Sequence, residues 1–165
     1  MVKATFKWIV LFFIAFVLQS TLAPIISIYN VKPDLLTLVL FLLAIKAGII
    51  PAVYVGFFLG LAQDVYSPAI LGQNALAKTI AGFFAGLFNE KIMRLDPIIQ
   101  TVLLVITVIL CDLIFLTVQV VKSGSTLQFI GTQIFTTALP QALYTLFFGI
   151  IPIFWEHFFQ SATKR

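Results

Sequence analysis

The segment QTVLLVITVILCDLIFLTVQVV, residues 100–121, decides the fold, because it is one long apolar run in which Asp112 is the only charged residue. A run of ~20 apolar residues is long enough to cross the hydrocarbon core of a bilayer. Inside lipid, a single spanning segment satisfies its backbone hydrogen bonds by forming an α-helix. The segment therefore predicts a membrane helix, and the same pattern recurs along the chain on both sides of it.

The composition extends this prediction to the whole chain. Hydrophobic residues make up 61% of the sequence and charged residues 10%, with a mean hydropathy of +1.13, whereas soluble domains carry about 25% charged residues. No polar stretch approaches the ~50 residues of a small soluble domain. We therefore expect an all-α integral membrane protein in which residues 1–165 form a single membrane domain. The first apolar run is long and lacks a small-residue cleavage site, so we expect it to be a retained span.

Six hydrophobic stretches predict six transmembrane helices in a compact bundle. The expected spans cover about 6–28, 34–47, 50–66, 73–89, 97–121 and 128–154. Asp96 and Pro97 suit the cap and first turn of the fifth span, and Pro140 predicts a kink in the sixth. The second and third spans are individually weak, and a rival interpretation fuses them into a bent hairpin that does not cross. We favour two crossings, with Lys46 reaching the interface by its long stem.

Lysine and arginine in the loops predict the orientation. With the N-terminus in the cytoplasm, only Lys32 and Lys122 lie outside, and both termini are cytoplasmic. The expected outer loops, 29–34, 66–73 and 122–127, are too short for an external domain. The net charge of +4 then orients the protein in the membrane, since no basic stripe with interleaved aromatic residues exists for nucleic acid. The basic residues expected inside are Lys3, Lys7, Lys46, Lys91, Arg94, Lys164 and Arg165.

Small residues recur at helical spacing in the third and fourth spans. Gly56 and Gly60 form a G-x-x-x-G pattern in the third span, and Gly82 and Gly86 repeat it in the fourth. Such patterns let helix backbones approach closely in lipid. Together they predict a tight hairpin between these two spans. A neighbouring alanine stripe faces either this hairpin or an external partner; its members are Ala77, Ala81 and Ala85.

Three charged residues lie inside apolar runs: Asp64, Lys78 and Asp112. A charge at the bilayer centre costs at least ~2.5–3.5 kcal/mol unless it is paired or hydrated. Counted from the expected span ends, all three fall in the outer part of the bundle, so we expect a buried Asp–Lys–Asp cluster with a structural role. The alternatives are a proton or ion relay and groups that are unpaired or reach the interface by their stems.

The sequence carries no recognisable catalytic, cofactor-binding or metal-binding pattern. It lacks the H-E-x-x-H, G-x-S-x-G and Walker A motifs. Cys111 is the only cysteine, which excludes an internal disulfide. We therefore expect a protein that is not an enzyme and that needs no cofactor.

Three segments together resemble one protein family. KPDL (32–35) opens the second span, GFFLGLAQD (56–64) closes the third, and LGQNALAKTIAGF (71–83) opens the fourth; CDLI (111–114) adds a weaker match. Their order and spacing are similar to those of the rod shape-determining protein MreD of bacteria. The short chain, the six expected spans and the short outer loops agree with this resemblance.

The resemblance implies a non-enzymatic scaffold subunit of the bacterial rod complex, a multi-pass protein of the cytoplasmic membrane. It implies docking of MreC and association with RodA, the elongation transpeptidase and MreB, so that peptidoglycan synthesis is linked to cell shape. It also implies a fold similar to the S-components of energy-coupling-factor vitamin transporters. The candidate interaction sites are the glycine faces, the charge cluster and the outer turn Lys32-Pro33-Asp34. In that turn, Pro33 fixes the entry to the second span and Asp34 caps it.

A vitamin-binding S-component is the alternative function. The short outer loops count against it, since they offer little material for a lid. An ion-coupled transporter would need a continuous polar path, and the inner halves of the spans show none. The polar residues that would line a pocket are Asp64, Gln73, Asn74, Lys78, Asp112 and Gln119, with Gln19 as a further candidate.

Overall fold

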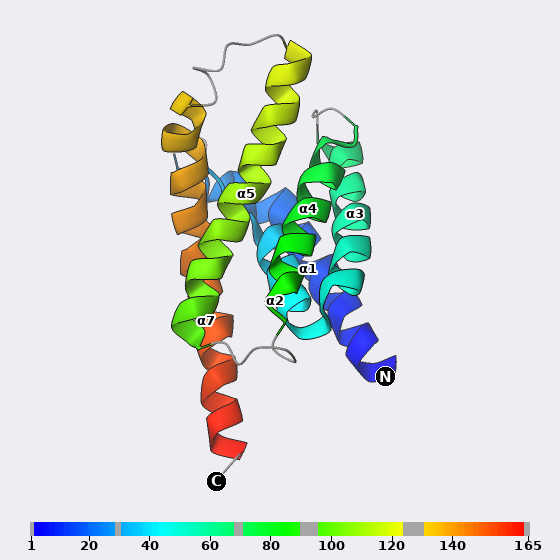
Figure 1. Cartoon of the computed structure of the whole chain (residues 1–165), viewed down its shortest axis with the longest axis vertical. Coiled ribbons are helices and arrows are strands. Elements are labelled where there is room, and N and C mark those ends of the chain that lie inside the picture. Colours follow the sequence, from blue (N-terminus) through cyan, green and yellow to red (C-terminus); the bar gives the residue numbers. More distant parts are fainter. Residues whose placement is uncertain (1, 29–30, 68–70, 90–95, 124–130, 164–165) are drawn as a thin grey trace.

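The computed structural model describes residues 2–28, 31–67, 71–89, 96–123 and 131–163, and within these ranges it is all-helical apart from an isolated bridge between Ile28 and Val31. The predicted all-α class is thereby confirmed. The start of α1 and the end of α7 lie at the same end of the bundle (Figure 1). The elements are α1 (Val2–Ile25), α2 (Leu35–Ala47), α3 (Ile49–Tyr66), α4 (Gln73–Leu87), α5 (Pro97–Ser123), the π-helical η1 (Ile134–Ala138) and α7 (Leu139–Thr163).

Four of the described helices are long and apolar enough to cross a membrane. Their apolar stretches are Lys7–Ile25, Ile49–Tyr66, Pro97–Lys122 and Gly131–Trp155. The other two, α2 and α4, have 13 and 15 residues, so at 1.5 Å per residue they extend ~20 Å and ~22 Å. That is less than the ~30 Å of a typical hydrocarbon core. The observed bounds of α2 and α4 match the expected spans closely, but their length alone does not make them candidate spans.

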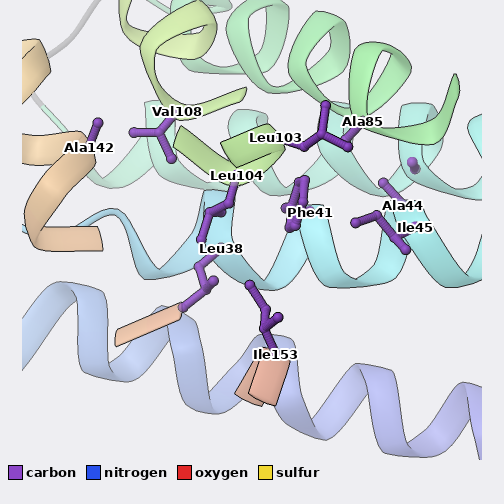
Figure 2. Packing of buried hydrophobic residues seen from close by; sticks show 11 residues of the cluster. Leu38, Phe41, Ala44, Ile45, Ala85, Leu103, Leu104, Val108, Ala142 and Ile153 are labelled. Atoms are coloured by element: carbon purple, nitrogen blue, oxygen red, sulfur yellow. The ribbon is translucent and has the colours of Figure 1, made fainter. Parts of the chain in front are cut away.

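The short helix α2 is the centre of the bundle. Its residues are apolar on every side, and most of them are buried. Phe41, Ala44 and Ile45 of α2 contact a core to which α3, α4, α5 and α7 also contribute. Figure 2 shows Leu38 and Phe41 extending from α2 toward the surrounding helices. Because α2 is enclosed by protein, it does not need the length of a helix that faces lipid.

A single residue joins α2 to α3. Gly48 has φ +90°, a conformation that favours glycine, and its N–H closes α2 by donating to the carbonyl of Ala44 at 2.9 Å. A Cβ at this position would lie 2.6 Å from Nδ2 of Asn89. The chain therefore reverses within one residue, so α2 and α3 pack side by side as a hairpin with Lys46 near its tip.

The predicted tight hairpin of α3 and α4 is confirmed. These two helices share the most extensive contact in the described structure. A Cβ at Gly56 would lie 2.5 Å from the carbonyl oxygen of Lys78, and one at Gly82 would lie 2.7 Å from that of Ala52. Gly60 and Gly86 likewise face the backbone of the opposite helix. All four glycines are therefore needed for the backbones to come this close.

The alanine stripe of α4 faces the interior of this chain. Ala77 and Ala81 pack against Cys111 of α5, with Ile114 and Phe115 at the edge of the cluster. Ala85 belongs to the main core around α2. Of the two expectations for this stripe, neither the α3 hairpin nor an external partner describes it, because α4 uses its glycine face for α3 and its alanine face for α2 and α5.

The irregularity expected at Pro140 is a π-helical turn. η1 ends directly before α7, and the N–H of Leu139 donates to the carbonyl of Ile134, five residues earlier. Proline lacks the N–H that an α-helix would require at this point, and π-turns are one way in which a helix accommodates such a break. The extra residue in the π-turn changes the helical register between the residues before the turn and those after it. Gln133, before the turn, and Gln141, after it, both line the cavity described below.

Candidate functional site

The bundle contains a buried ion pair between two helix beginnings. Asp34 is the N-cap residue of α2, and Lys78 lies in the second turn of α4. Lys78 Nζ and Asp34 Oδ2 are 2.9 Å apart, and the side chains are 1% and 9% exposed. Lys78 Nζ also donates to Thr37 Oγ1 at 2.9 Å, and that hydroxyl donates to Asp34 Oδ2 at 2.6 Å. Charge-assisted bonds of this kind are stronger than neutral ones.

The surrounding chain fixes Asp34 in place. Its Oδ1 accepts the N–H of Thr37 at 2.9 Å, which is the cap that the sequence predicted. The N–H of Asp34 donates to Thr145 Oγ1 of α7 at 2.9 Å. The next N–H, that of Leu35, donates to Gln19 Oε1 of α1 at 2.8 Å. The start of α2 therefore ties together α1, α4 and α7.

The prediction of an Asp64–Lys78–Asp112 cluster named the wrong partner for Lys78. The acid that binds the lysine is Asp34, which the sequence predicted as the cap of the second span in the outer turn and not as a partner of Lys78. Pro33 and Asp34 are in fact buried, and only Lys32 of this turn is exposed. The prediction failed because the span ends set the depth of a residue along its helix but not the side of the helix it occupies. The enclosed position of α2 brings its N-terminus next to α4.

Asp64 instead caps the N-terminus of α4. The cap residue of α4 is Gly72, which has no side chain to offer. Asp64, near the end of α3, accepts the N–H groups of Gly72 and Asn74 at 2.9 Å and that of Ala75 at 3.1 Å. It also accepts Nδ2 of Asn74 at 2.8 Å. A carboxylate here satisfies donors that would otherwise lack partners and faces the positive end of the helix dipole.

Asp112 is only partly satisfied. Its Oδ1 accepts Nε2 of Gln141 from α7 at 3.0 Å. Its Oδ2 is buried and has no hydrogen-bond partner among the described residues, and the same holds for Oε1 of Gln63 on α3. Buried polar atoms without a partner are rare in folded proteins, so these two oxygens call for a donor that the described side chains do not supply.

The ion pair and Asp112 line one cavity of about 340 Å³. We call it the polar cavity. The lining contains four charged residues, Lys32, Asp34, Lys78 and Asp112. Six side-chain amides also line it: Gln19, Gln63, Asn74, Gln119, Gln133 and Gln141. Such a concentration of polar groups within an apolar bundle is the feature that defines the candidate site.

The sequence predicted much of this lining but not all of it. Gln19, Asn74, Lys78, Asp112 and Gln119 were expected at a pocket and line the cavity. Asp64 and Gln73 do not, because Asp64 caps α4 and Gln73 Nε2 donates to the carbonyl of Phe115 at 2.8 Å.

Several lining residues were missed. Asp34 carried a signal, since a buried cap that follows a proline and precedes an apolar run needs a counter-charge. Gln63 lies next to Asp64 and was available from the same motif. Gln133 and Gln141 lie on either side of the π-turn, whose register cannot be read from the sequence.

The described residues contain no group of three or more His, Cys, Asp or Glu that could hold a metal ion. What the lining of the polar cavity presents to a ligand is hydrogen-bonding groups and charged groups.

The fold and cavity define a small all-helical membrane protein with its polar residues gathered inside. The family model for the rod shape-determining protein MreD matches residues 2–161. The chain therefore belongs to the MreD family, as the motifs of the second, third and fourth spans predicted, and it has a role in determining rod shape. Neither a curated protein nor a solved structure matches the chain.

Proposed function

We propose that this protein is a non-enzymatic scaffold of the bacterial rod complex that docks MreC and links the peptidoglycan synthesis enzymes to cell-shape control. RodA, the elongation transpeptidase and MreB would be further members of the assembly. The observation that carries the proposal is the family match over nearly the whole chain. The proposal also includes a fold similar to that of energy-coupling-factor S-components.

The packing of the described residues supports a scaffold. The glycine faces of α3 and α4, the Asp34–Lys78 pair and the bond from Asp34 to Thr145 join α2, α3, α4 and α7 into one packed body. The outer surfaces are apolar: Phe13 on α1, Phe58 on α3 and Phe147 on α7 are all more than half exposed. Exposed apolar side chains on the helices of a membrane protein face lipid or a partner helix.

We further propose that the chain crosses the cytoplasmic membrane six times, with both termini in the cytoplasm. The helices run alternately up and down the bundle, and α1 begins at the end where α7 finishes (Figure 1). Of the basic residues used for orientation, Lys46 lies in the last turn of α2 and Lys122 in the last turn of α5. These two helix ends lie at opposite ends of the bundle (Figure 1). Lys91, Arg94, Lys164 and Arg165 lie outside the described residues.

Affinity capture of the full chain from membranes tests the function. We expect a tagged protein to recover MreC, and a strain that lacks the gene to regain rod shape when the gene is restored. Recovery of an ATPase module together with a bound vitamin would show an S-component and overturn the proposal. Normal rod shape without the gene would overturn it as well.

A further inference from the structure

The polar cavity contains two buried acceptor oxygens that no donor of the described chain satisfies. They are Oδ2 of Asp112 on α5 and Oε1 of Gln63 on α3, and both residues line the cavity. Leaving a buried polar atom unpaired is unfavourable, more so for a charged group. The two side chains line one cavity from different helices, so the cavity is the place from which a donor outside the chain would reach them.

The cationic groups of the cavity do not supply that donor. Lys78 Nζ donates to Asp34 Oδ2 and Thr37 Oγ1, so it is already the counter-charge of Asp34. Within the described residues no lysine or arginine forms an ion pair with Asp112, whose bonded neighbour is the neutral amide of Gln141. A buried carboxyl group without a cation is neutralised in one of two ways, by taking up a proton or by a positive group that binds beside it.

We propose that the polar cavity binds a primary ammonium group, with Asp112 Oδ2 and Gln63 Oε1 as its acceptors. An ammonium group carries the positive charge that would pair with a carboxylate at Asp112. It also carries N–H donors for both oxygens. The volume of about 340 Å³ corresponds to on the order of ten water molecules at ~30 Å³ each. This is enough for a polar head group, but not for a whole lipid.

The rim of the cavity favours an amine whose neighbour is anionic. Lys32 lines the cavity and is exposed, so it belongs to the part of the lining that is open to the surroundings. A phosphate attached close to the bound amine would meet this lysine. The ethanolamine head group of a phospholipid has that arrangement, and a small soluble amine phosphate has it too. The shared chemistry is the primary ammonium, and the source is decided by experiment.

Native mass spectrometry of the full chain purified in detergent provides the first test. The protein is equilibrated with equal amounts of phosphatidylethanolamine, phosphatidylcholine and phosphatidylglycerol. Phosphatidylcholine is the informative comparison, because its quaternary ammonium has the same charge but no N–H donor. We expect phosphatidylethanolamine to be retained on the order of tenfold better than phosphatidylcholine, the ratio given by one charge-assisted hydrogen bond.

The substitution Asp112→Asn tests the acceptor without changing its shape. We expect it to abolish the preference for phosphatidylethanolamine. Asp96→Asn, an exposed position before α5, is the matched control and should leave the preference intact. Gln63→Met, which removes the second acceptor, replaces Asp112→Asn if that variant does not fold.

A second measurement distinguishes a lipid from a soluble amine. Ethanolamine or O-phosphoethanolamine is added to lipid-free protein and the midpoint of thermal unfolding is followed. A rise in the wild type that is absent in Asp112→Asn supports a soluble amine, whereas lipid preference without such a rise supports a head group. Equal retention of all three lipids and no effect of the amines would overturn the proposal. Loss of MreC recovery in Asp112→Asn without amine binding would also overturn it, because a partner side chain would then fill the cavity.

Discussion

At the scale of single residues, the four charged residues Asp34, Asp64, Lys78 and Asp112 are stabilised in different ways. Asp34 and Lys78 satisfy each other, Asp64 is held by backbone N–H groups, and Asp112 has only one of its oxygens bonded. Of these four residues, the sequence predicted that Asp64, Lys78 and Asp112 lie inside the bundle, whereas it placed Asp34 at the outer turn before the second span. It did not predict which acid meets the lysine, because that choice depends on helix rotation, which one sequence does not specify.

The Asp34–Lys78 pair leads to a prediction about stability. Lys78→Met should lower the free energy of unfolding by about 3–5 kcal/mol, because Asp34 then remains as a buried charge without its cation. The midpoint of thermal unfolding in detergent measures the loss. The double variant Asp34→Asn/Lys78→Met should recover part of it, since no buried charge is left. A single variant as stable as the wild type would show that the ion pair is not structural.

The capping role of Asp64 leads to a second prediction. Asp64→Ala should lower stability by about 1–3 kcal/mol, because the N–H groups of Gly72, Asn74 and Ala75 lose their acceptor. Asp64→Asn keeps one acceptor oxygen and should lose less. The same thermal assay measures both variants. Equal losses in the two variants would argue against capping, and strong non-additivity with Lys78→Met would argue for a direct Asp64–Lys78 contact.

At the scale of elements, spacing was more informative than charge. The paired glycine patterns identified which two helices pack together, because backbone approach in lipid requires small residues on both partners. The alanine stripe did not reveal its neighbour, since Ala77 and Ala81 would fit against any smooth helix. In the sequence, Pro140 was the only sign of the π-turn at Ile134–Ala138. Its register decides that both Gln133 and Gln141 line the cavity.

A single added methyl group tests the α3–α4 contact. Gly60→Ala places a Cβ against the backbone of Ala75 and Asn74, which cannot move without shifting a helix, so we expect a loss of about 1–3 kcal/mol. Gly131→Ala is the matched control, because a Cβ there meets nothing within 4 Å. Thermal unfolding of the two variants in detergent gives the comparison. Equal stability of both variants would contradict the close packing.

In cells, the bulkier Gly60→Leu should disrupt complex assembly or rod shape, whereas Gly131→Leu should not.

At the scale of the whole molecule, hydropathy predicted the order of the helices because apolar length is a direct constraint of the bilayer; the helix ends were less accurate, since α1 begins at Val2 and α7 continues to Thr163, beyond the expected spans 6–28 and 128–154. It could not show that α2 is enclosed by its neighbours, since an interior helix and a lipid-facing helix have the same composition when the solvent is hydrocarbon. The two short helices therefore decide the topology. If α2 and α3 form a hairpin that does not cross, the tip near Lys46 lies on the same side as Lys32.

Labelling of single cysteines in intact cells distinguishes these topologies. In a Cys111→Ala background, six crossings predict that Lys32→Cys and Lys122→Cys react with a membrane-impermeant maleimide added outside. Lys46→Cys should react only after the membrane is permeabilised, because the tip of the α2–α3 hairpin would then face the cytoplasm. Reaction of Lys46→Cys in intact cells would contradict six crossings. Lys32 precedes α2 and Lys46 lies in its last turn. Opposite labelling of these two positions would therefore show that a helix of 13 residues, only ~20 Å long, separates the two sides of the membrane. Such a crossing requires either local thinning of the bilayer or neighbouring helices that shield the ends of α2 from lipid.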